Sequence, residues 1–404
     1  LDAKGDVNGD GFKDVFVGQP FYTDSAKTGV NHGRVVLYEG SSSGISQSAS
    51  WSITGDKNGE KLGLGIETGD FDNDGFDDVA VGGFEWKKIV NEDTETRGRV
   101  VTYLGSSVGL PTGQPAHSVH EGTKDGSRLG RAVSVGDLNC DGFDDLVAGT
   151  PTFSPTAGSF SGAVNVYFGG STSGGSQAVP STSDWRWEGS TAGGQAGVSV
   201  TARGNFDNSN CGDLAVGSPF GGSGKVSIWK SPLTSTPSAG SPDTTVTPTS
   251  SSGFGFDVIS AGDTNGDSFD DLAVGAFTEG TNSSGAVYVY DGSASGVVTS
   301  NPWKATGTNN SRFGQSVAGG DINGDGITDL LVGAPRTSSN PTSSSPNEEG
   351  GAYIFLGKSG SGLTKPAFWE YTFSQSSAQY GISTDILETS TPVAPSTPAY
   401  AAVG

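Results

Sequence analysis

The 404-residue chain has few of the residues that build long helices, membrane spans or zinc centres. It contains no methionine, two cysteines and three histidines, and charged residues make up 16% of it. No apolar stretch reaches the length of about 18 residues that a membrane span requires, so we expect none in this chain. No basic stripe is present either, which argues against nucleic acid as a partner. What remains is rich in serine, threonine and 66 glycines, a composition typical of a loop-rich β protein that is secreted or displayed on a cell surface.

The acidic residues behind the net charge of −22 gather in one short phrase that occurs six times. In its cleanest copies the phrase reads Asp-x-Asn-x-Asp-Gly-x-x-Asp, followed by an apolar run that ends in glycine. The copies begin at Asp6, Asp70, Asp137, Asn205, Asp263 and Asp321. They recur every 58 to 68 residues or so, and a fixed period in this range indicates repeated supersecondary units.

One period contains four predicted strands. In the fifth copy these are 254–259, 271–275, 285–290 and 303–307, with the acidic phrase as the turn between the first two. Short strands grouped by four and repeated along the chain predict an all-β fold, a β-propeller of four-stranded blades. We expect residues 1–388 to form one such domain.

The repeat resembles a known family at this point. Phe313-Gly314, the acidic phrase and the Gly-Ala-Pro at 333–335 are similar to the FG-GAP repeat of integrin α-subunit propellers and of many bacterial surface and secreted proteins. Weaker forms of the Gly-Ala-Pro element follow the other copies. The resemblance implies a propeller with calcium in the loop between the first and second strands of each blade.

The residue types in the phrase predict calcium independently of the family. Side-chain oxygens at positions 1, 3, 5 and 9 and the backbone carbonyl at position 7 provide the all-oxygen shell that a hard cation prefers, and glycine at position 6 permits the sharp turn. The alternative is an Asx-rich turn without metal. Five copies are nearly complete, so we expect about five structural calcium ions. The predicted ligand sets are Asp6, Asn8, Asp10, Phe12 and Asp14; Asp70, Asp72, Asp74, Phe76 and Asp78; Asp137, Asn139, Asp141, Phe143 and Asp145; Asp263, Asn265, Asp267, Phe269 and Asp271; and Asp321, Asn323, Asp325, Ile327 and Asp329.

The fourth copy, 205–213, departs from the pattern because it lacks Asp-Gly at positions 5 and 6. We expect it to hold no metal. The two cysteines fall in neighbouring loops, Cys140 in the third copy and Cys211 in the fourth, and a secreted chain with an even number of cysteines usually oxidises them. We therefore predict a disulfide between them that substitutes for the missing ion.

The number of blades depends on the two ends of the chain. The first copy has no Phe-Gly strand before it, whereas the C-terminal region has an unmatched candidate at Tyr380. If that strand joins the first sheet, the ring closes as six blades, which we prefer because closure removes an exposed sheet edge. The alternative is a seventh, degenerate repeat with a strand at 400–404. Residues 389–404 are otherwise a Pro/Ser/Thr-rich tail leading toward a further domain or anchor.

Ligand binding is expected on the face opposite the calcium loops, where the connections from second to third strands vary most. Aromatic side chains in these loops are candidate ligand contacts. They are Phe21, Tyr22, Phe84, Trp86 and Phe153.

Signals of catalysis are few. Two Gly-x-Ser-x-Gly matches, at 40–44 and 105–109, fall at hairpin turns without a following helix and do not predict a nucleophile. The first function class is therefore an extracellular, calcium-stabilised recognition module that binds a protein or a glycan, in adhesion or as a lectin. The second is a secreted enzyme acting on glycans or phosphoesters, or the non-catalytic propeller of one.

Overall fold

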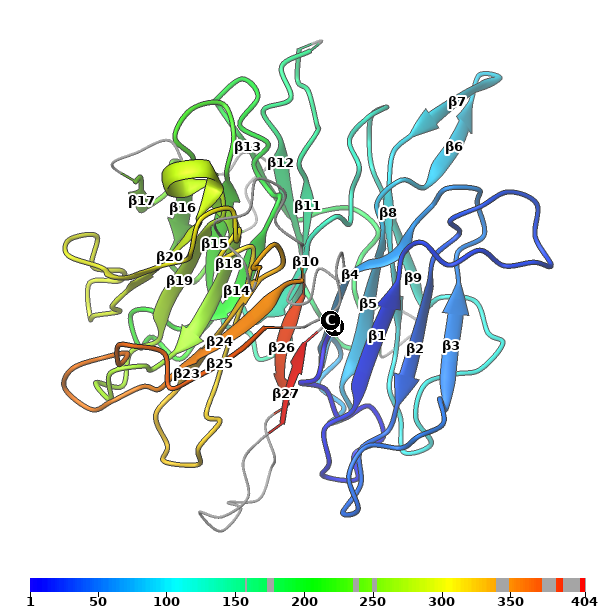
Figure 1. Ribbon diagram of the computed structural model, residues 1–404. Coiled ribbons are helices and arrows are strands. Elements are labelled where there is room, and N and C mark those ends of the chain that lie inside the picture. Colours follow the sequence, from blue (N-terminus) through cyan, green and yellow to red (C-terminus); the bar gives the residue numbers. More distant parts are fainter. Residues whose placement is uncertain are drawn as a thin grey trace. The chain divides into compact units, whose positions relative to one another are not determined.

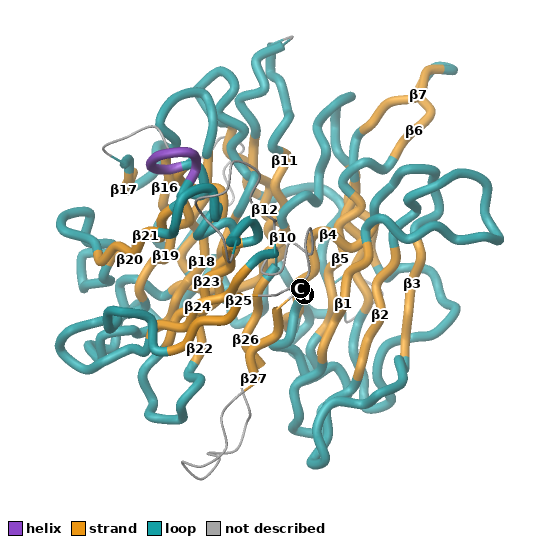
Figure 2. The backbone as a smooth tube through the Cα atoms, in the orientation of Figure 1, coloured by secondary structure: helices purple, strands orange, loops and turns teal. Residues whose placement is uncertain are grey.

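The computed structural model describes residues 1–156, 158–172, 178–234, 240–248, 253–338, 349–372, 383–387 and 400–403. Almost all of the regular structure in these residues is β-strand, and the one helical element among them is a short turn at Glu279–Ser283 (Figures 1 and 2). The chain is an all-β, six-bladed propeller made of small antiparallel sheets, as the repeat predicts. Within the described residues, no helix is long and apolar enough to cross a membrane.

The residues divide into two compact units, each holding three blades. Unit 1 comprises Leu1–Ala202 and Ser231–Ser241, and unit 2 comprises Arg203–Lys230 and Pro242–Gly404. In unit 1, blade 1 is β1 (Val15–Gln19), β2 (Arg34–Tyr38) and β3 (Trp51–Thr54); blade 2 is β4 (Leu62–Gly69), β5 (Asp78–Gly83), β8 (Arg99–Tyr103) and β9 (Ser118–Glu121); and blade 3 is β10 (Val133–Gly136), β11 (Asp145–Thr150), β12 (Ala163–Tyr167) and β13 (Trp185–Glu188). A separate hairpin, β6 (Lys87–Val90) with β7 (Asp93–Thr96), extends the loop between β5 and β8 (Figure 1).

Unit 2 repeats the same order of strands. Blade 4 is β14 (Val200–Gly204, which spans the boundary between the units), β15 (Asp213–Ser218), β16 (Lys225–Trp229) and β17 (Thr244–Val246); blade 5 is β18 (Phe254–Gly262), β19 (Asp271–Ala276), β20 (Ala286–Tyr290) and β21 (Trp303–Thr306); and blade 6 is β22 (Ser316–Gly320), β23 (Asp329–Ala334), β24 (Gly351–Phe355) and β25 (Trp369–Thr372). The four strands predicted in the fifth copy are thus confirmed.

The C-terminal part of the chain forms a small sheet of its own. Tyr380 itself lies outside the described residues, and the strand that follows it, β26 (Thr384–Leu387), pairs with β27 (Tyr400–Val403) in a two-stranded sheet. β26 lies against β22 and β23 of its own unit. Blade 1 has three strands, with one bridge between Asp2 and Phe16 in the place of a first strand. Among the described residues no strand pairing joins β26 or β27 to blade 1, so the completion of the first sheet by a strand at Tyr380 stays a prediction.

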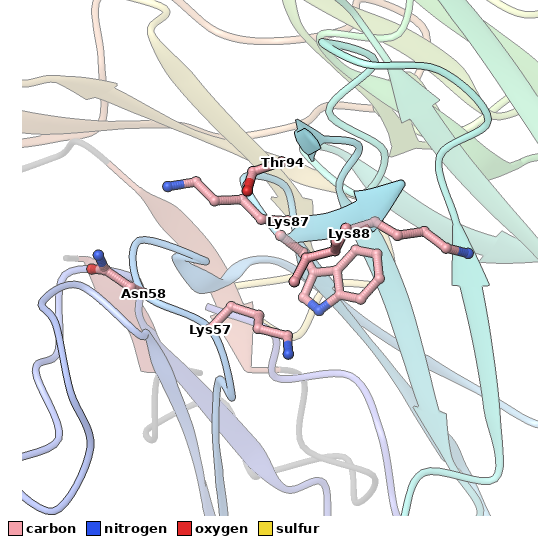
Figure 3. A pocket seen from close by; sticks show the side chains of 7 residues that line it. Lys57, Asn58, Lys87, Lys88 and Thr94 are labelled. Carbon is pink, nitrogen blue, oxygen red and sulfur yellow. The ribbon is translucent and has the colours of Figure 1, made fainter. Parts of the chain in front are cut away.

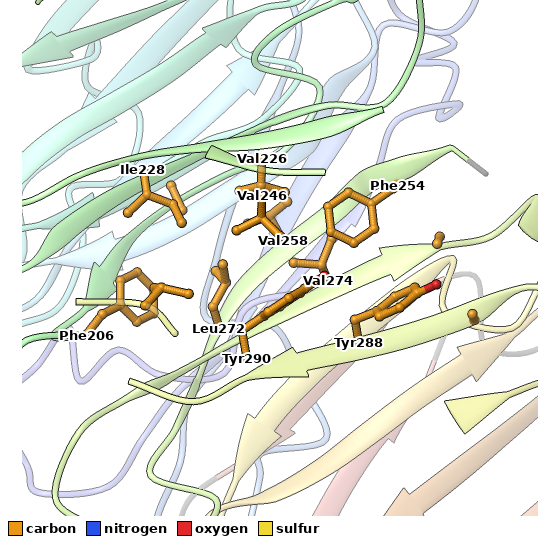
Figure 4. Packing of buried hydrophobic residues seen from close by; sticks show 14 residues of the cluster. Phe206, Val226, Ile228, Val246, Phe254, Val258, Leu272, Val274, Tyr288 and Tyr290 are labelled. Carbon is orange, nitrogen blue, oxygen red and sulfur yellow. The ribbon is translucent and has the colours of Figure 1, made fainter. Parts of the chain in front are cut away.

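The hydrophobic core lies between neighbouring blades. In unit 2 a cluster of buried side chains joins Val226 and Ile228 of blade 4 to Phe254, Leu272 and Tyr288 of blade 5 (Figure 4). In unit 1 an equivalent cluster joins blades 1 and 2. Each sheet therefore buries its apolar faces only by packing on the next sheet, which is why no repeat is stable alone.

Two glycines of the repeat set how closely the blades approach. A Cβ atom on Gly149 of β11 would lie 2.0 Å from the carbonyl oxygen of Gly197, which opens blade 4 and has a φ of +83°. Gly149 is therefore required for space and Gly197 for its left-handed backbone. The same approach recurs between Gly18 and Gly63, Gly82 and Gly130, Gly217 and Gly255, and Gly275 and Gly314.

This contact gives a test of the packing. We expect Gly149→Ala to lower the free energy of unfolding by about 3 kcal/mol, because the backbone carbonyl has no room to move away from the new methyl group. Gly170→Ala is the matched control, since a Cβ there meets nothing within 4 Å. Urea unfolding of the two variants would measure the difference, and equal stability would show that the blades can separate without cost.

Candidate functional site

Each acidic phrase forms the loop between the first and second strands of its blade, or in blade 1 between the bridge at Asp2 and β1, and is closed by its own side chains. In the first loop Asp6 Oδ1 accepts the N–H of Asp10 at 3.1 Å, and Asp6 Oδ2 accepts the N–H of Gly11 at 2.8 Å. The position-1 aspartates of four other loops accept the same two backbone donors: Asp70, Asp137, Asp263 and Asp321. The backbone of each of these loops therefore curves around the carboxylate of the aspartate at position 1.

The aspartate at position 9 is fully buried and ties the loop to the rest of its blade. Asp14 Oδ2 accepts the N–H of Val7 at 3.0 Å, and Oδ1 accepts the N–H of Gly40, in the turn after β2, at 2.9 Å. The same two contacts are made by Asp78, Asp145, Asp271 and Asp329. The side chain predicted as a calcium ligand is thus also a structural clamp.

Burial makes these carboxylates unfavourable as bare anions. It raises the pKa of Asp78 and of Asp145 to about 8 and the pKa of Asp14, Asp271 and Asp329 to about 6, although the backbone N–H donors act in the opposite direction. The other loop carboxylates add to the rise. A neighbouring positive charge would relieve this cost.

The second loop brings its predicted ligands together. Asp70, Asp72 and Asp78 each offer an oxygen within 4.8 Å of the others, and they are the one group among the described residues with three or more His, Cys, Asp or Glu side chains this close. Asp72 Oδ1 is buried and has no hydrogen-bond partner, and the same holds for Oδ1 of Asn265 at position 3 of the fifth loop. A buried oxygen that accepts no hydrogen bond fits a cation, so the residues present suit the expected metal.

Position 8 carries a role that sequence reasoning missed. Asp77 Oδ2 accepts the N–H of Asp6 at 2.6 Å, and its own N–H donates to the Asp6 carbonyl at 3.1 Å, so two successive loops are joined. Asp144 with Asp70 and Asp270 with Asn205 repeat this exchange. The doubled aspartates 77–78, 144–145 and 270–271 were the available signal.

A lysine side chain from outside the fourth loop provides a positive charge next to it. Lys230 Nζ lies 3.4 Å from Asp207 Oδ2 at position 3, and the Asp207 side chain is only 11% exposed. Lys230 follows directly after β16. The equivalent residue after β20 in the fifth loop is Asp291, a carboxylate whose pKa is raised by burial and by Asp267, and which hydrogen-bonds Asn265. The residue that follows the third strand of the blade is therefore a cation, Lys230, beside the fourth loop, which is expected to lack metal. It is an anion, Asp291, beside the fifth loop, which is expected to bind metal.

The two cysteines are oxidised, as predicted. Both are disulfide-bonded and the chain has no others, so Cys140 and Cys211 are joined. The fourth loop is therefore secured by a covalent bond as well as by Lys230.

At the other end of the blades, the five predicted aromatic contacts divide into two groups. Phe21 is 69% exposed and Tyr22 and Phe84 are half-buried, so these three reach the surface. Trp86 and Phe153 are buried, so their rings are not free surfaces for a ligand to stack on, as contact through the ring would require. Phe153 is covered because Lys124 and Arg186 lie over its ring, at 5.0 and 4.3 Å from the centroid.

Phe21 and Phe84 share one cation. Lys61 Nζ lies 5.6 Å from the Phe21 centroid and 5.4 Å from the Phe84 centroid, and it also pairs with Glu85 at 3.3 Å. The exposed Phe21 ring is therefore held by a cation–π contact, which suits a preformed binding surface.

The role of Lys230 is testable. We expect Lys230→Gln to lower the free energy of unfolding by about 0.5 to 1 kcal/mol, because Asp207 loses its partner, and the loss should be the same in calcium and in EDTA. Lys225→Gln, at the opposite end of β16, is the control and should have no such effect. A loss that occurs only in calcium would mean that Lys230 acts through a metal site and not in place of one.

The sequence matches two repeat-family models over segments that contain these acidic loops. The FG-GAP repeat family matches residues 129–167, 256–290 and 313–355, and the FG-GAP-like repeat matches residues 6–81. Together these segments contain the first, second, third, fifth and sixth acidic loops.

Individual relatives match parts of longer proteins. Phosphatidylinositol-glycan-specific phospholipase D of Bos taurus is 34% identical over 116 residues, 27% of this chain and 13% of that protein. Integrin alpha pat-2 of Caenorhabditis briggsae is 28% identical over 285 residues, 68% of this chain and 18% of that protein. The chain thus spans less than a fifth of the length of these relatives. A solved structure, the exotype rhamnogalacturonan lyase YesX, aligns with 93% of this chain and 66% of its own at 13% identity and a TM-score of 0.40. On its repeats and its sheets, the chain belongs to the FG-GAP repeat β-propellers and is related to integrin α subunits and phosphatidylinositol-glycan-specific phospholipase D.

Proposed function

We propose that this chain is an extracellular recognition module, stabilised by calcium, that binds a protein or a glycan through the loops between its second and third strands. The observation that carries the calcium part is the group Asp70, Asp72 and Asp78, with the unpartnered Asp72 Oδ1 among them. The disulfide supports a secreted or cell-surface location, because disulfides persist in oxidising compartments.

Calcium would be held by the five predicted ligand sets and would supply the positive charge that the buried position-9 aspartates lack. Its role is structural. Each loop leads into the second strand of its blade, and three pairs of successive loops are joined through positions 1 and 8. A bound ion would therefore stiffen several strands at once.

Two aspartates of the second loop test metal binding and the structural clamp in different ways. Asp74 at position 5 is exposed, whereas Asp78 at position 9 holds two backbone N–H groups. We expect Asp74→Asn to weaken calcium binding and to lower the melting temperature in calcium but not in EDTA. Asp78→Ala should lower the free energy of unfolding by about 2 to 4 kcal/mol in either condition, because two buried donors lose their acceptor.

Calorimetry with calcium and EDTA measures both effects. The wild type should bind about five ions and melt at a lower temperature in EDTA. An unchanged melting temperature on calcium removal would refute the structural role of the metal.

The recognition part is supported by the loops between second and third strands. They carry the largest differences between blades, including the hairpin β6–β7 and the turn Glu279–Ser283. Phe21 is exposed there beside Lys61, Phe84 and Glu85, so apolar, cationic and anionic groups are presented together. Such a mixed surface around an aromatic side chain is typical of binding sites.

A glycan array and a pull-down with the calcium-loaded protein test this assignment. We expect stable binding that falls at least about tenfold in Phe21→Ala, as for an aromatic residue at the centre of an interface. Val108→Ala is the matched control, because Val108 is 90% exposed but lies in the turn after β8, at the calcium end of blade 2.

A second candidate is a secreted hydrolase of glycans or phosphoesters, or the non-catalytic propeller of one. It is supported by the relative named as a phospholipase D, although only 13% of that protein is matched. Hydrolysis of a polysaccharide or phosphoester without stable binding would favour this candidate over the recognition module.

A further inference from the structure

We propose that a cavity beside the hairpin β6–β7 binds the acidic group of a carboxylated or sulfated sugar residue. The proposal rests on the recognition function above and names its ligand class. The cavity measures about 400 Å³ and lies within unit 1. Lys57 and Asn58 line it from the segment between β3 and β4, and Lys87, Lys88 and Thr94 line it from the hairpin (Figure 3). Trp86 and Ile89 complete the lining.

The cavity offers hydrogen-bond donors and positive charge but no acid. None of the described residues that line it is Asp or Glu, although the chain carries a net charge of −22. Lys88 pairs with Glu121, which lies outside the lining. Lys57 and Lys87 form no ion pair with any described residue. Lys57 acts on Asp56 only at longer range, as one of the charges that lower the pKa of that carboxyl. Two ammonium groups without a close ion pair at one cavity suit an anionic ligand.

Trp86 adds a donor that is already desolvated. Its side chain is only 7% exposed, and its indole Nε1–H has no hydrogen-bond partner in the described structure. A buried N–H without an acceptor is costly, so an acceptor oxygen brought by a ligand would remove an existing penalty.

The surroundings hold these groups in place before any ligand arrives. Arg99 lies over the Trp86 ring, 5.3 Å from its centroid, and donates to Glu60 Oε1 from Nε at 2.8 Å. The other Glu60 oxygen accepts the N–H of Lys57 at 3.1 Å and that of Asp56 at 2.9 Å. One buried ion pair therefore fixes both the indole and the backbone that carries Lys57, which is the preorganisation a binding site needs.

Size and lining favour a sugar over a free anion. A cavity of about 400 Å³ lies in the range of small-ligand sites and exceeds what a carboxylate or sulfate alone would fill. Asn58 Oδ1 accepts the N–H of Val30 at 2.9 Å, which leaves the amide nitrogen to bond a hydroxyl group, and Thr94 provides a second hydroxyl partner. Ile89, which is 75% exposed, provides an apolar rim for ring C–H groups.

Titration calorimetry on the calcium-loaded full chain tests the proposal with three oligosaccharides. They are a glucuronate-terminated tetrasaccharide, its carboxyl-reduced neutral counterpart and a sulfated counterpart. We expect the neutral form to bind about tenfold or more weakly than at least one acidic form, as for the loss of a charged hydrogen bond. Which acidic form binds tighter identifies the carboxylate or the sulfate as the preferred group.

Variants localise the site. The double variant Lys57→Gln with Lys87→Gln should abolish the preference for acid and its salt dependence. Trp86→Phe should weaken binding while keeping the aromatic ring, and Lys358→Gln, an exposed lysine of blade 6, should change nothing. Equal binding of the neutral form, absence of binding by all three sugars, or full binding by the double variant would each overturn this site. If the glycan array still yields a ligand sensitive to Phe21→Ala, the recognition function stands without it.

Discussion

The approach of one glycine to the next blade is the constraint on which the rest of the propeller depends. A second-strand glycine, such as Gly149, admits the carbonyl oxygen of a glycine that opens the following blade, at a distance where any Cβ would clash. The residue before that second glycine forms a parallel bridge to the preceding blade, as Ala196 does with Gly162. Because the sheets come this close, their apolar faces exclude water from the space between them, and the core can lie between blades. The Phe-Gly and Gly-Ala-Pro elements are therefore two halves of one contact.

The acidic loops also hold strands and neighbouring loops together, through hydrogen bonds from their aspartates. The loop aspartates at positions 1, 5 and 9 that were expected to bind calcium also accept backbone N–H groups, and position 9 does so with both oxygens. Desolvated carboxylates of this kind favour a nearby positive charge. In the fourth loop Lys230 provides a positive charge beside Asp207, and the disulfide adds a covalent restraint. Burial raises the pKa of the position-9 aspartate in the other five loops, where a bound calcium ion, as proposed above, would provide the compensating charge.

Much of the fold could be predicted, and less of the candidate site. The strands that follow the acidic phrases and the oxidation of Cys140 and Cys211 were predictable because local pattern and composition determine them. The burial of Trp86 and Phe153 was not, because it depends on Arg99, Lys124 and Arg186, which come from other strands and loops. The interloop contact of Asp77 with Asp6 and the pairing of β26 with β27 were missed for the same reason: they join residues from separate turns or loops.

By itself the sequence determined the repeat, the strand order within a blade and the oxygen-rich loops, since each follows from residues that are close along the chain. The tertiary structure was needed to show which aspartate holds which backbone N–H, which aromatic rings reach the surface, and that Lys57 and Lys87 line one cavity with the buried Trp86. The physical reason is that hydrogen bonding, burial and charge compensation depend on neighbours in space. In a propeller those neighbours belong to the next blade, about 60 residues away.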